Sequence, residues 1–424
     1  GSVSDITISA GSTSGTATLT PVDDTLFENS ETAIVDIAVS GGGASESGSQ
    51  QRTITITDKA LDSGTQNSYN SSTATAWLSE VEFHQSGLDS DDDPYKNINL
   101  HKALAYSNGS GLMLGSGEVI AIMDSGFDVS GYGSNTTTHQ EFSGKTITEL
   151  NTSYFLNYDG SNTSSAYWHG TMVAGIAAGN FGTGSSMGVA PAADLHLHSF
   201  LFTGTASSAP EWWALGTDDA RADGAIVQNN SWGFDDSQTL NPAQTAYNAN
   251  YAINDYVAYK NNNSVTSSQT LAAHASLDND SNGTNDIVYT ATATQWDTYI
   301  SALNSFQNSG VIVFALSNNF DYDDADVSAG LPELYPQLEE AWITVANVEI
   351  DGTGAMSGKT YTLQSAPCGS TADYCLSADG TNILGPGGND YLVGGYDYEL
   401  NSGSSFAAPQ VSGAIALLAT HFPN

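Results

Sequence analysis

The sequence predicts an α/β protein with a doubly wound, mostly parallel sheet, preceded by a small all-β antiparallel module. Short, continuous apolar runs recur between residues 119 and 348, and stretches with helical periodicity separate them. Buried parallel strands are apolar along their whole length because helices cover both faces of the sheet. The first 59 residues differ, since short Thr, Val and Ile segments alternate there with Gly and Ser turns, as in antiparallel strands with one buried face.

The change in pattern divides the chain into three parts. Residues 1–59 form the β module, residues 60–80 a linker, and residues 81–424 the large domain. The linker assignment rests on residues 60–75, which are polar and aperiodic.

The β module resembles the second half of a Calx-β domain in residues 16–37 (TATLTPVDDTLFENSETAIVDI) and 53–58 (TITITD). That resemblance implies calcium ligands at strand ends, namely Asp23, Asp24, Glu28, Glu31 and Asp58. We favour a structural role, because the first half of the family's pattern is absent. Half a sandwich leaves sheet edges unpaired, so we expect the module to pair with another chain or domain.

Five apolar runs predict the strands of the large domain: VIAIMD, LHLHSF, AIVQNNSW, VIVFALS and AWITVANV. Between the last three lie further helical stretches, of which 294–306 is the clearest. Its apolar residues at positions 296, 299, 300, 303 and 306 fall on one helical face. A second helix is predicted from Ser405 to about His421. Ligands of such sheets bind beyond the carboxyl ends of the strands, where Asp124 lies.

The composition excludes several classes of partner. The 424 residues hold 8 Lys plus Arg against 47 Asp plus Glu, a net charge of −39. Nucleic acid and anionic membrane surfaces would be repelled, whereas basic protein substrates would be attracted. No apolar run reaches the roughly 18 residues that span a bilayer, so we expect no membrane insertion. Cys368 and Cys375 predict a small disulfide and an oxidising compartment, the alternative being two reduced thiols.

Three residues point to nucleophilic catalysis. Ser405 lies in GSSFAAP at a helix start, Asp124 ends an apolar strand, and His169 opens the small-residue helix HGTMVAGIAAG. A hydroxyl becomes nucleophilic when an imidazole takes its proton, and a carboxylate fixes the tautomer of that imidazole. Free backbone N–H groups at a helix start also stabilise a developing oxyanion.

The surrounding motifs resemble the subtilisin family of serine proteases across residues 81–424. DSG at 124–126, HGTMVAG at 169–175, GVAP at 188–191, NNSWG at 229–233 and GSSFAAP at 403–409 stand in family order. The resemblance implies a subtilisin-like fold and a serine endopeptidase that cleaves protein or peptide substrates through an acyl-enzyme. In it Asp124 orients, His169 acts as base and then acid, and Ser405 attacks the carbonyl. A catalytically inactive scaffold serving as an adhesin or binding protein is the alternative.

The same resemblance implies further residues at the site. Asn319 would donate to the oxyanion, and we favour it over Asn318 because the preceding strand fixes the count from Gly310. Substrate backbone and side chain would meet a set of four residues. These are Ser231, Trp232, Gly233 and Leu316. For Trp232, simple core packing is an equal alternative.

Metal binding is a separate question. The loop 278–286 (DNDSNGTND) has the spacing of the first nine positions of a calcium loop, and its ligands would be Asp278, Asp280, Asn282 and Asp286. An ordinary solvated loop is the alternative, because Tyr289 replaces the usual Glu. His196 and His198 share one strand face, and we favour a packed pair, since the sequence shows no third ligand nearby.

Two acidic runs, 90–94 and 320–326, are interpreted as solvated loops. The second follows the predicted oxyanion residue, so the alternative is that it favours Lys or Arg in substrates. The stretch CGSTADYCLSADG resembles autotransporter-type proteases of Gram-negative bacteria. That resemblance implies a secreted or cell-surface protein.

Overall fold

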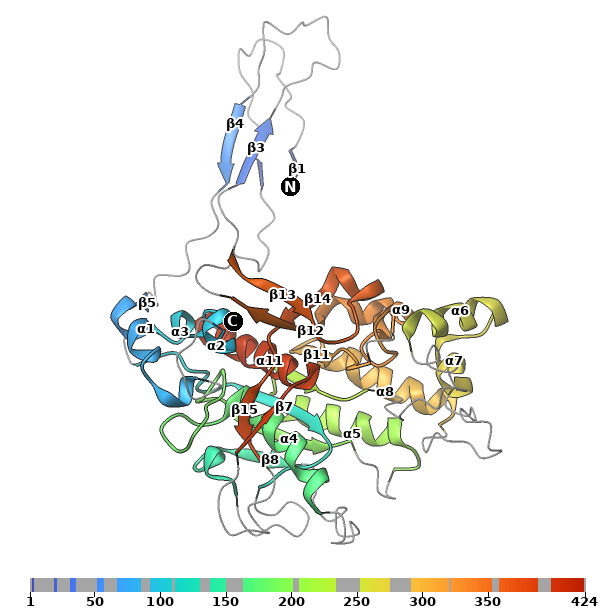
Figure 1. The fold of residues 1–424 in the computed structure, drawn as a ribbon. Helices are drawn as coiled ribbons and strands as arrows, with labels where there is room; N and C mark the ends of the chain where they lie inside the picture. Colours follow the sequence, from blue (N-terminus) through green and yellow to red (C-terminus); the bar gives the residue numbers. More distant parts are fainter. Residues whose placement is uncertain are drawn as a thin grey trace, which may run out of the picture. The chain divides into compact units, whose positions relative to one another are not determined.

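Figure 1 shows the computed structural model of the chain, which divides into two compact units, Gly1–Asn67 and Ser68–Asn424. In the first unit the structure describes Asn67 and the backbone of four short strands. In the second it describes residues 68–84, 92–108, 111–129, 138–149, 163–200, 206–233, 252–274, 291–319, 322–352, 358–387 and 398–422. Side chains of 163–168 and of residue 274 are outside this description.

The first unit contains antiparallel pairs, as its alternating pattern predicts. Strand β1 (Ser2–Val3) pairs with β2 (Leu19–Thr20), and β3 (Glu31–Val35) pairs with β4 (Arg52–Ile56). Glu31 begins β3. The other four proposed acidic ligands, Asp23, Asp24, Glu28 and Asp58, lie outside the described residues.

The second unit is built on a mostly parallel sheet in the order β13-β12-β11-β10-β7-β9-β8, with β14 also paired to β12. All pairs are parallel except β12 with β13. The strands are β7 (Val119–Asp124), β8 (Ile147–Glu149), β9 (Asp194–Ser199), β10 (Val227–Asn230), β11 (Val311–Ala315), β12 (Trp342–Asp351), β13 (Thr360–Leu363) and β14 (Cys375–Ala378). The predicted α/β class with a small antiparallel module is confirmed.

Helices cover both faces of this sheet, and two hydrophobic cores result (Figure 1). On one face Ile120 and Ile122 pack with α4 (Thr163–Ala178) and α11 (Ser404–His421). On the other face Ala121 and Met123 pack with α5 (Ala209–Ala222) and α8 (Ala293–Phe306). Successive side chains of a strand point to opposite faces, so one apolar strand supplies both cores.

Helix α8 matches its prediction closely. All five apolar residues expected on one face are buried: Trp296, Tyr299, Ile300, Leu303 and Phe306. The helix begins at a capping box, because the Thr292 hydroxyl accepts from the N–H of Gln295 and the Gln295 side chain accepts from the N–H of Thr292. The cap and the apolar face together explain why this segment is a helix.

Shorter elements complete the second unit. They are β5 (Ser68–Tyr69), α1 (Ser71–Trp77), η1 (Val81–Phe83), α2 (Pro94–Asn97), α3 (Leu100–Ala103), β6 (Tyr106–Ser107), η2 (Gln140–Phe142), α6 (Ile253–Asn263), α7 (Ser267–His274), α9 (Leu331–Leu334), η5 (Pro336–Ala341), η7 (Gly369–Tyr374), β15 (Ile383–Pro386) and β16 (Tyr398–Asn401). Antiparallel pairs join β5 to β6 and β15 to β16. None of the described helices is long and apolar enough to cross a bilayer.

Part of the predicted linker differs from expectation, because α1 lies within it. Asn70 caps this helix by accepting from the N–H groups of Ser72 and Thr73, at 2.9 and 3.1 Å. Trp77 ends it, is buried in the core and donates to the carbonyl of Leu104 at 3.2 Å. Polar composition concealed a short helix that a side-chain cap and one buried Trp stabilise.

The predicted disulfide is confirmed. Cys368 and Cys375 are bonded to each other and enclose the short helix η7. The bridge therefore clamps the connection between β13 and β14.

Candidate active site

The carboxyl end of β7 brings two of the three predicted residues together. Asp124 is fully buried, and its Oδ1 accepts from Nδ1 of His169 at 2.7 Å and from the backbone N–H of Ser125 at 2.7 Å. Helix α4 approaches this strand end closely, because a Cβ on Gly170 would lie 2.2 Å from the carbonyl oxygen of Gly126. A glycine after the histidine is therefore required for the contact.

Two opposing effects act on His169. Burial lowers the pKa of this imidazole, but the charge of Asp124 and the hydrogen bond to it outweigh burial, and the net shift is upward. The side chain remains 24% exposed. With Nδ1–H donating to the carboxylate, Nε2 is the nitrogen that takes a proton.

Ser405 is the second residue of α11, packed against the end of β10. Its hydroxyl donates to the carbonyl of Ser231 at 3.3 Å, and the Ser231 hydroxyl donates to the carbonyl of Ser405 at 2.9 Å. The ring centroids of His169 and Phe406, the next residue in α11, are 5.7 Å apart. Asp124 and His169 thus meet at the end of β7, and Ser405 contacts the residue after the neighbouring strand β10.

The residues after β11 hold the start of α11. Asn318 Oδ1 accepts from the backbone N–H of Ser404 at 2.9 Å and from its hydroxyl at 3.0 Å. The neighbouring Asn319 is partly exposed, and its backbone N–H donates to the Ser317 hydroxyl at 3.0 Å. The Asn318 oxygen therefore acts as a helix cap, a role that the sequence did not indicate.

A cavity of about 160 Å³ lies beside Ser405. It is lined by Ser231, Trp232, Gly233, Ala315, Leu316, Ser317, Asn318, Asp326, Ser404 and Ser405. All four expected substrate-contacting residues are among them. Trp232 also packs against other aromatic rings, at centroid distances of 4.7 Å to Trp213 and 5.6 Å to Phe314. Trp232 therefore lines the cavity and also packs among aromatic rings, and its contact with substrate stays a prediction.

Two local predictions need correction. His169 does not open its helix, because α4 begins at Thr163. The acidic runs are not wholly solvated either: Asp93, Asp324 and Asp326 are 1%, 5% and 1% exposed. Backbone N–H groups explain their burial, since Lys96, Ser370 and Ser328 donate to these carboxylates at 3.0, 2.7 and 2.8 Å.

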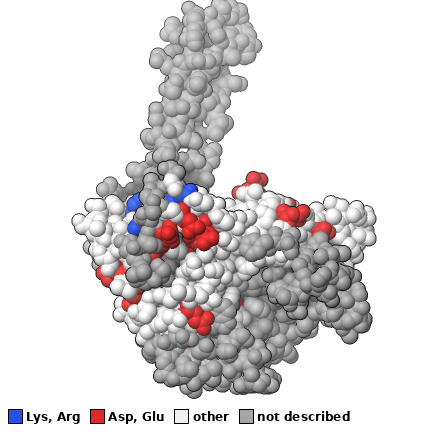
Figure 2. All heavy atoms as spheres, viewed as in Figure 1, with Lys and Arg blue, Asp and Glu red and all other residues white. Residues whose placement is uncertain are grey.

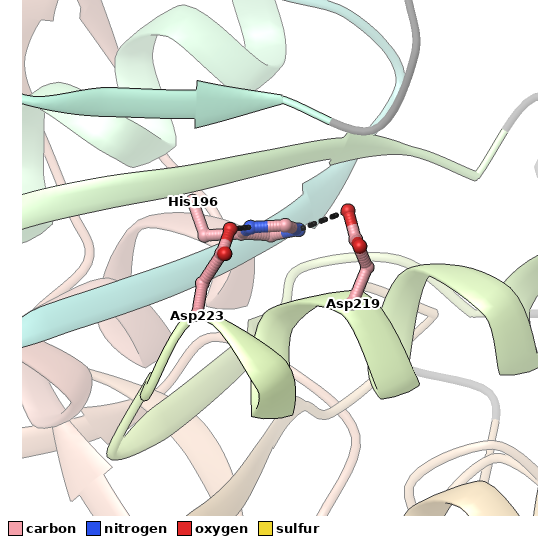
Figure 3. Close-up of side chains that lie close together, drawn as sticks. All are labelled: His196, Asp219 and Asp223. Carbon is pink, nitrogen blue, oxygen red and sulfur yellow. Dashed lines mark hydrogen bonds and ion pairs between the residues drawn. The ribbon is translucent and has the colours of Figure 1, made fainter.

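The predicted calcium loop, with Asp278, Asp280, Asn282 and Asp286, lies outside the described residues. Among the side chains that the structure describes, one group lies close enough to hold a metal ion: His196, Asp219 and Asp223. Figure 3 shows the imidazole, from β9, between the carboxylates of Asp219, in α5, and Asp223, the C-cap of that helix. Its Nδ1 is 2.8 Å from Asp223 Oδ2, and its Nε2 is 4.0 Å from Asp219 Oδ2. An imidazole is a poor calcium ligand, so this group does not fit calcium.

Helix α5 and its C-cap residue therefore supply carboxylates beside His196 that the sequence did not indicate. His198 packs against Trp212, with ring centroids 4.8 Å apart. A Cβ on Gly216 would lie 2.2 Å from its ring. The expectation of a packed pair describes His198 well, whereas His196 faces charged partners.

The surface charge follows the composition. On the face shown in Figure 2, acidic side chains recur at several places, whereas Lys and Arg are visible at few. An acidic surface attracts positively charged segments of other proteins, and this attraction weakens as salt is added.

Two extracellular proteases are similar to this chain in sequence. An extracellular serine protease of Serratia marcescens is 27% identical over 335 residues, covering 75% of this chain but 29% of its own length. A second protein with that description, also from Serratia marcescens, is 26% identical over 305 residues and covers 68% and 27%. The chain thus spans less than a third of these relatives.

Solved structures are similar as well. The structure of sphericase is 20% identical, has a TM-score of 0.43, and covers 73% of this chain and 79% of its own. The subtilase family model matches residues 115–424, which include the five motifs from DSG at 124–126 to GSSFAAP at 403–409. The chain therefore belongs to the subtilase family of serine proteases.

Proposed function

We propose that this chain is a serine endopeptidase that hydrolyses peptide bonds of proteins. The observation that carries the proposal is the 2.7 Å hydrogen bond between His169 Nδ1 and Asp124 Oδ1, formed beside the start of the helix that bears Ser405. A buried carboxylate that fixes an imidazole next to a serine has the arrangement that nucleophilic catalysis needs. Family membership agrees with this reading.

In the proposed reaction, His169 Nε2 takes the hydroxyl proton as Ser405 Oγ bonds to the substrate carbonyl carbon. The oxyanion receives hydrogen bonds from the N–H of Ser405 and from the side chain of Asn319. Collapse breaks the C–N bond, and His169 passes the proton to the leaving amine. Water, deprotonated by the same imidazole, then releases the acyl group, and the proton returns to Oγ. Each donor to the oxyanion contributes about 3 to 4 kcal/mol to transition-state stabilisation.

Substrate backbone would lie along residues 231–233, where it can add as an extra strand. Main-chain hydrogen bonds then provide affinity, and the adjoining cavity selects a side chain. Ser231, Trp232, Gly233 and Leu316 line that cavity. The proposed contacts therefore agree with the shape of the site.

Covalent labelling tests the proposed function. A fluorophosphonate probe should label the wild-type chain, and Ser405→Ala should abolish labelling because the nucleophilic oxygen is gone. Ser402→Ala is the matched control, since Ser402 is exposed and lies three residues before Ser405. An unlabelled but folded wild-type chain would contradict the proposal and favour the inactive binding scaffold.

We also propose that the protein is secreted, and that it is held at a bacterial cell surface or released from it. The relatives are named extracellular proteases, and the disulfide fits an oxidising compartment.

Residues 1–59 would form the Calx-β-like module ahead of the protease domain, with a sheet edge available to another chain or domain. Crosslinking of the chain in solution, with no product from that module, would contradict the pairing.

Calcium is proposed as a structural stabiliser held by the loop 278–286, with no part in the chemistry. Its carboxylate and amide side chains are oxygen ligands at alternating positions, the type that calcium prefers. Adding a chelator should lower the melting temperature, and Asp280→Asn should remove most of that difference. An identical melting temperature with and without chelator would remove calcium from the account.

A further inference from the structure

One charged residue occurs among the described residues that line the cavity beside Ser405, and it is Asp326. The residue is 1% exposed. Its Oδ1 accepts from the backbone N–H groups of Ser328 at 2.8 Å and of Ala329 at 3.4 Å. Backbone donors fix the orientation of a carboxylate and stabilise its negative charge. The cavity therefore has a held carboxylate in its wall.

Gly233 leaves space beside this carboxylate because it has no side chain. A Cβ built on Gly233 would lie 2.9 Å from Asp326 Oδ1 and 3.4 Å from its Oδ2. Any side chain at position 233 would thus press on the carboxylate and cover it. Because the residue is glycine, both oxygens lie against bare backbone at the edge of the proposed substrate-binding segment.

The remaining walls suit an aliphatic stem. Trp232 and Leu316 line the same cavity, and Leu316 is 1% exposed. Lysine and arginine carry three or four methylene groups beneath a cationic end, and such stems pack on apolar surface. A basic side chain would therefore place its stem on these walls and its charge at Asp326.

We propose that Asp326 is a specificity-determining residue, selecting substrates with Lys or Arg on the acyl side of the scissile bond. This inference rests on the proposed protease function, because the cavity is a substrate pocket only if Ser405 attacks a peptide. A basic side chain in the cavity would form a charge-assisted interaction with this carboxylate, and a neutral side chain of the same shape would not.

The acidic surface predicts a different behaviour. A net charge of −39 attracts a basic peptide wherever its charge lies, and salt screens that attraction, since the Debye length is about 3 Å at 1 M. An ion pair formed at Asp326 depends on one position of the peptide and is screened much less. Position and salt dependence therefore separate the pocket from the surface.

The experiment uses the full chain and peptides that differ at the residue before the scissile bond. Arginine is compared with citrulline, which has the same shape without the charge. We expect kcat/KM to be about 100-fold higher for arginine, at both 0.1 and 1 M NaCl. Moving the arginine to other positions should give no comparable gain.

Two variants assign the effect to the carboxylate. Asp326→Asn should reduce the arginine-to-citrulline ratio to about 1, whereas Asp323→Asn should preserve it. Asp323 is an exposed acid three residues away, and it does not line the cavity. Both variants change the net charge equally. The wild-type ratio decides the matter even if Asp326→Asn does not fold.

Fluorophosphonate labelling of the same samples separates the two proposals. A labelled wild-type enzyme that cleaves arginine and citrulline peptides equally would overturn the role of Asp326 and leave the protease function standing. An unlabelled enzyme that cleaves no peptide would remove both. A preference that disappears at 1 M NaCl would assign it to the surface and also overturn the inference.

Discussion

The two faces of the large sheet have histidines in opposite situations, His169 from α4 and His198 from β9. On the face covered by α4, His169 meets the buried carboxylate of Asp124, and the pKa of the imidazole rises despite burial. On the face covered by α5, burial, followed by the neighbouring His196, lowers the pKa of His198 to about 3. Burial acts on both rings in the same direction. A carboxylate partner therefore decides which of them can take up a proton near neutral pH.

Asp124→Asn is expected to have the largest effect on the difference between the two histidines. The amide neither fixes the tautomer of His169 nor stabilises its protonated form, so kcat/KM should fall by about 10⁴-fold. Activity of the wild type requires neutral His169, and its acid limb should lie above the ordinary imidazole pKa of 6.5. In the variant only burial remains, so that limb should move to lower pH.

Kinetics between pH 5 and 9 measure both effects, with Asp218→Asn, an exposed acid on α5, as the control. An unmoved acid limb in Asp124→Asn would show that the carboxylate does not set the titration of His169. The contribution of His169 to folding stability has the opposite pH dependence to its contribution to activity. Because the folded pKa of His169 is raised, the stability it confers is present at low pH and is lost as the pH rises through that value.

A smaller effect is expected on the α5 face, from His198→Leu. In the wild type, the unfolded chain binds a proton at His198 below pH 6.5 and the folded chain does not until about pH 3. The free energy of unfolding should therefore fall with acidification, by up to about 1.4 kcal/mol per pH unit in that window. Leucine removes this titration and should flatten the profile.

Urea unfolding at pH 7 and at pH 5 measures how the free energy of unfolding changes with pH in each chain. Comparing these changes cancels any repacking cost of the substitution that is equal at the two pH values. The two slopes should differ by about 2 kcal/mol over this range. Equal slopes for the two chains would mean that folding does not lower the pKa of His198, and would contradict this prediction.

Local patterns made much of the fold predictable. Continuous apolar runs located the strands of the sheet, the spacing of Trp296, Tyr299 and Leu303 located a buried helix face, and close cysteines located the disulfide. These signals lie within short segments, where periodicity and turn chemistry act directly. The position of Asp124 at a strand end followed from the same reasoning.

Contacts between distant segments escaped prediction. Asn318 caps α11 from 86 positions away, Asp326 lines the cavity because its loop folds back towards Gly233, and Asp223 reaches His196 only when α5 packs on β9. An acidic run looks the same in sequence whether its carboxylates face water or backbone N–H groups. Tertiary packing decides between the two, and no local pattern encodes it.

Strand β7 is hydrogen-bonded to a parallel strand on each side. Its six residues are in register with Asp194–Ser199 on one side and, for four of them, with Val227–Asn230 on the other. A single residue inserted within the strand would exchange the two sets of side chains between the layers. The carboxylate at its end would then turn from the imidazole of α4 towards the aromatic layer under α5, so this stretch permits substitution but not a change of length.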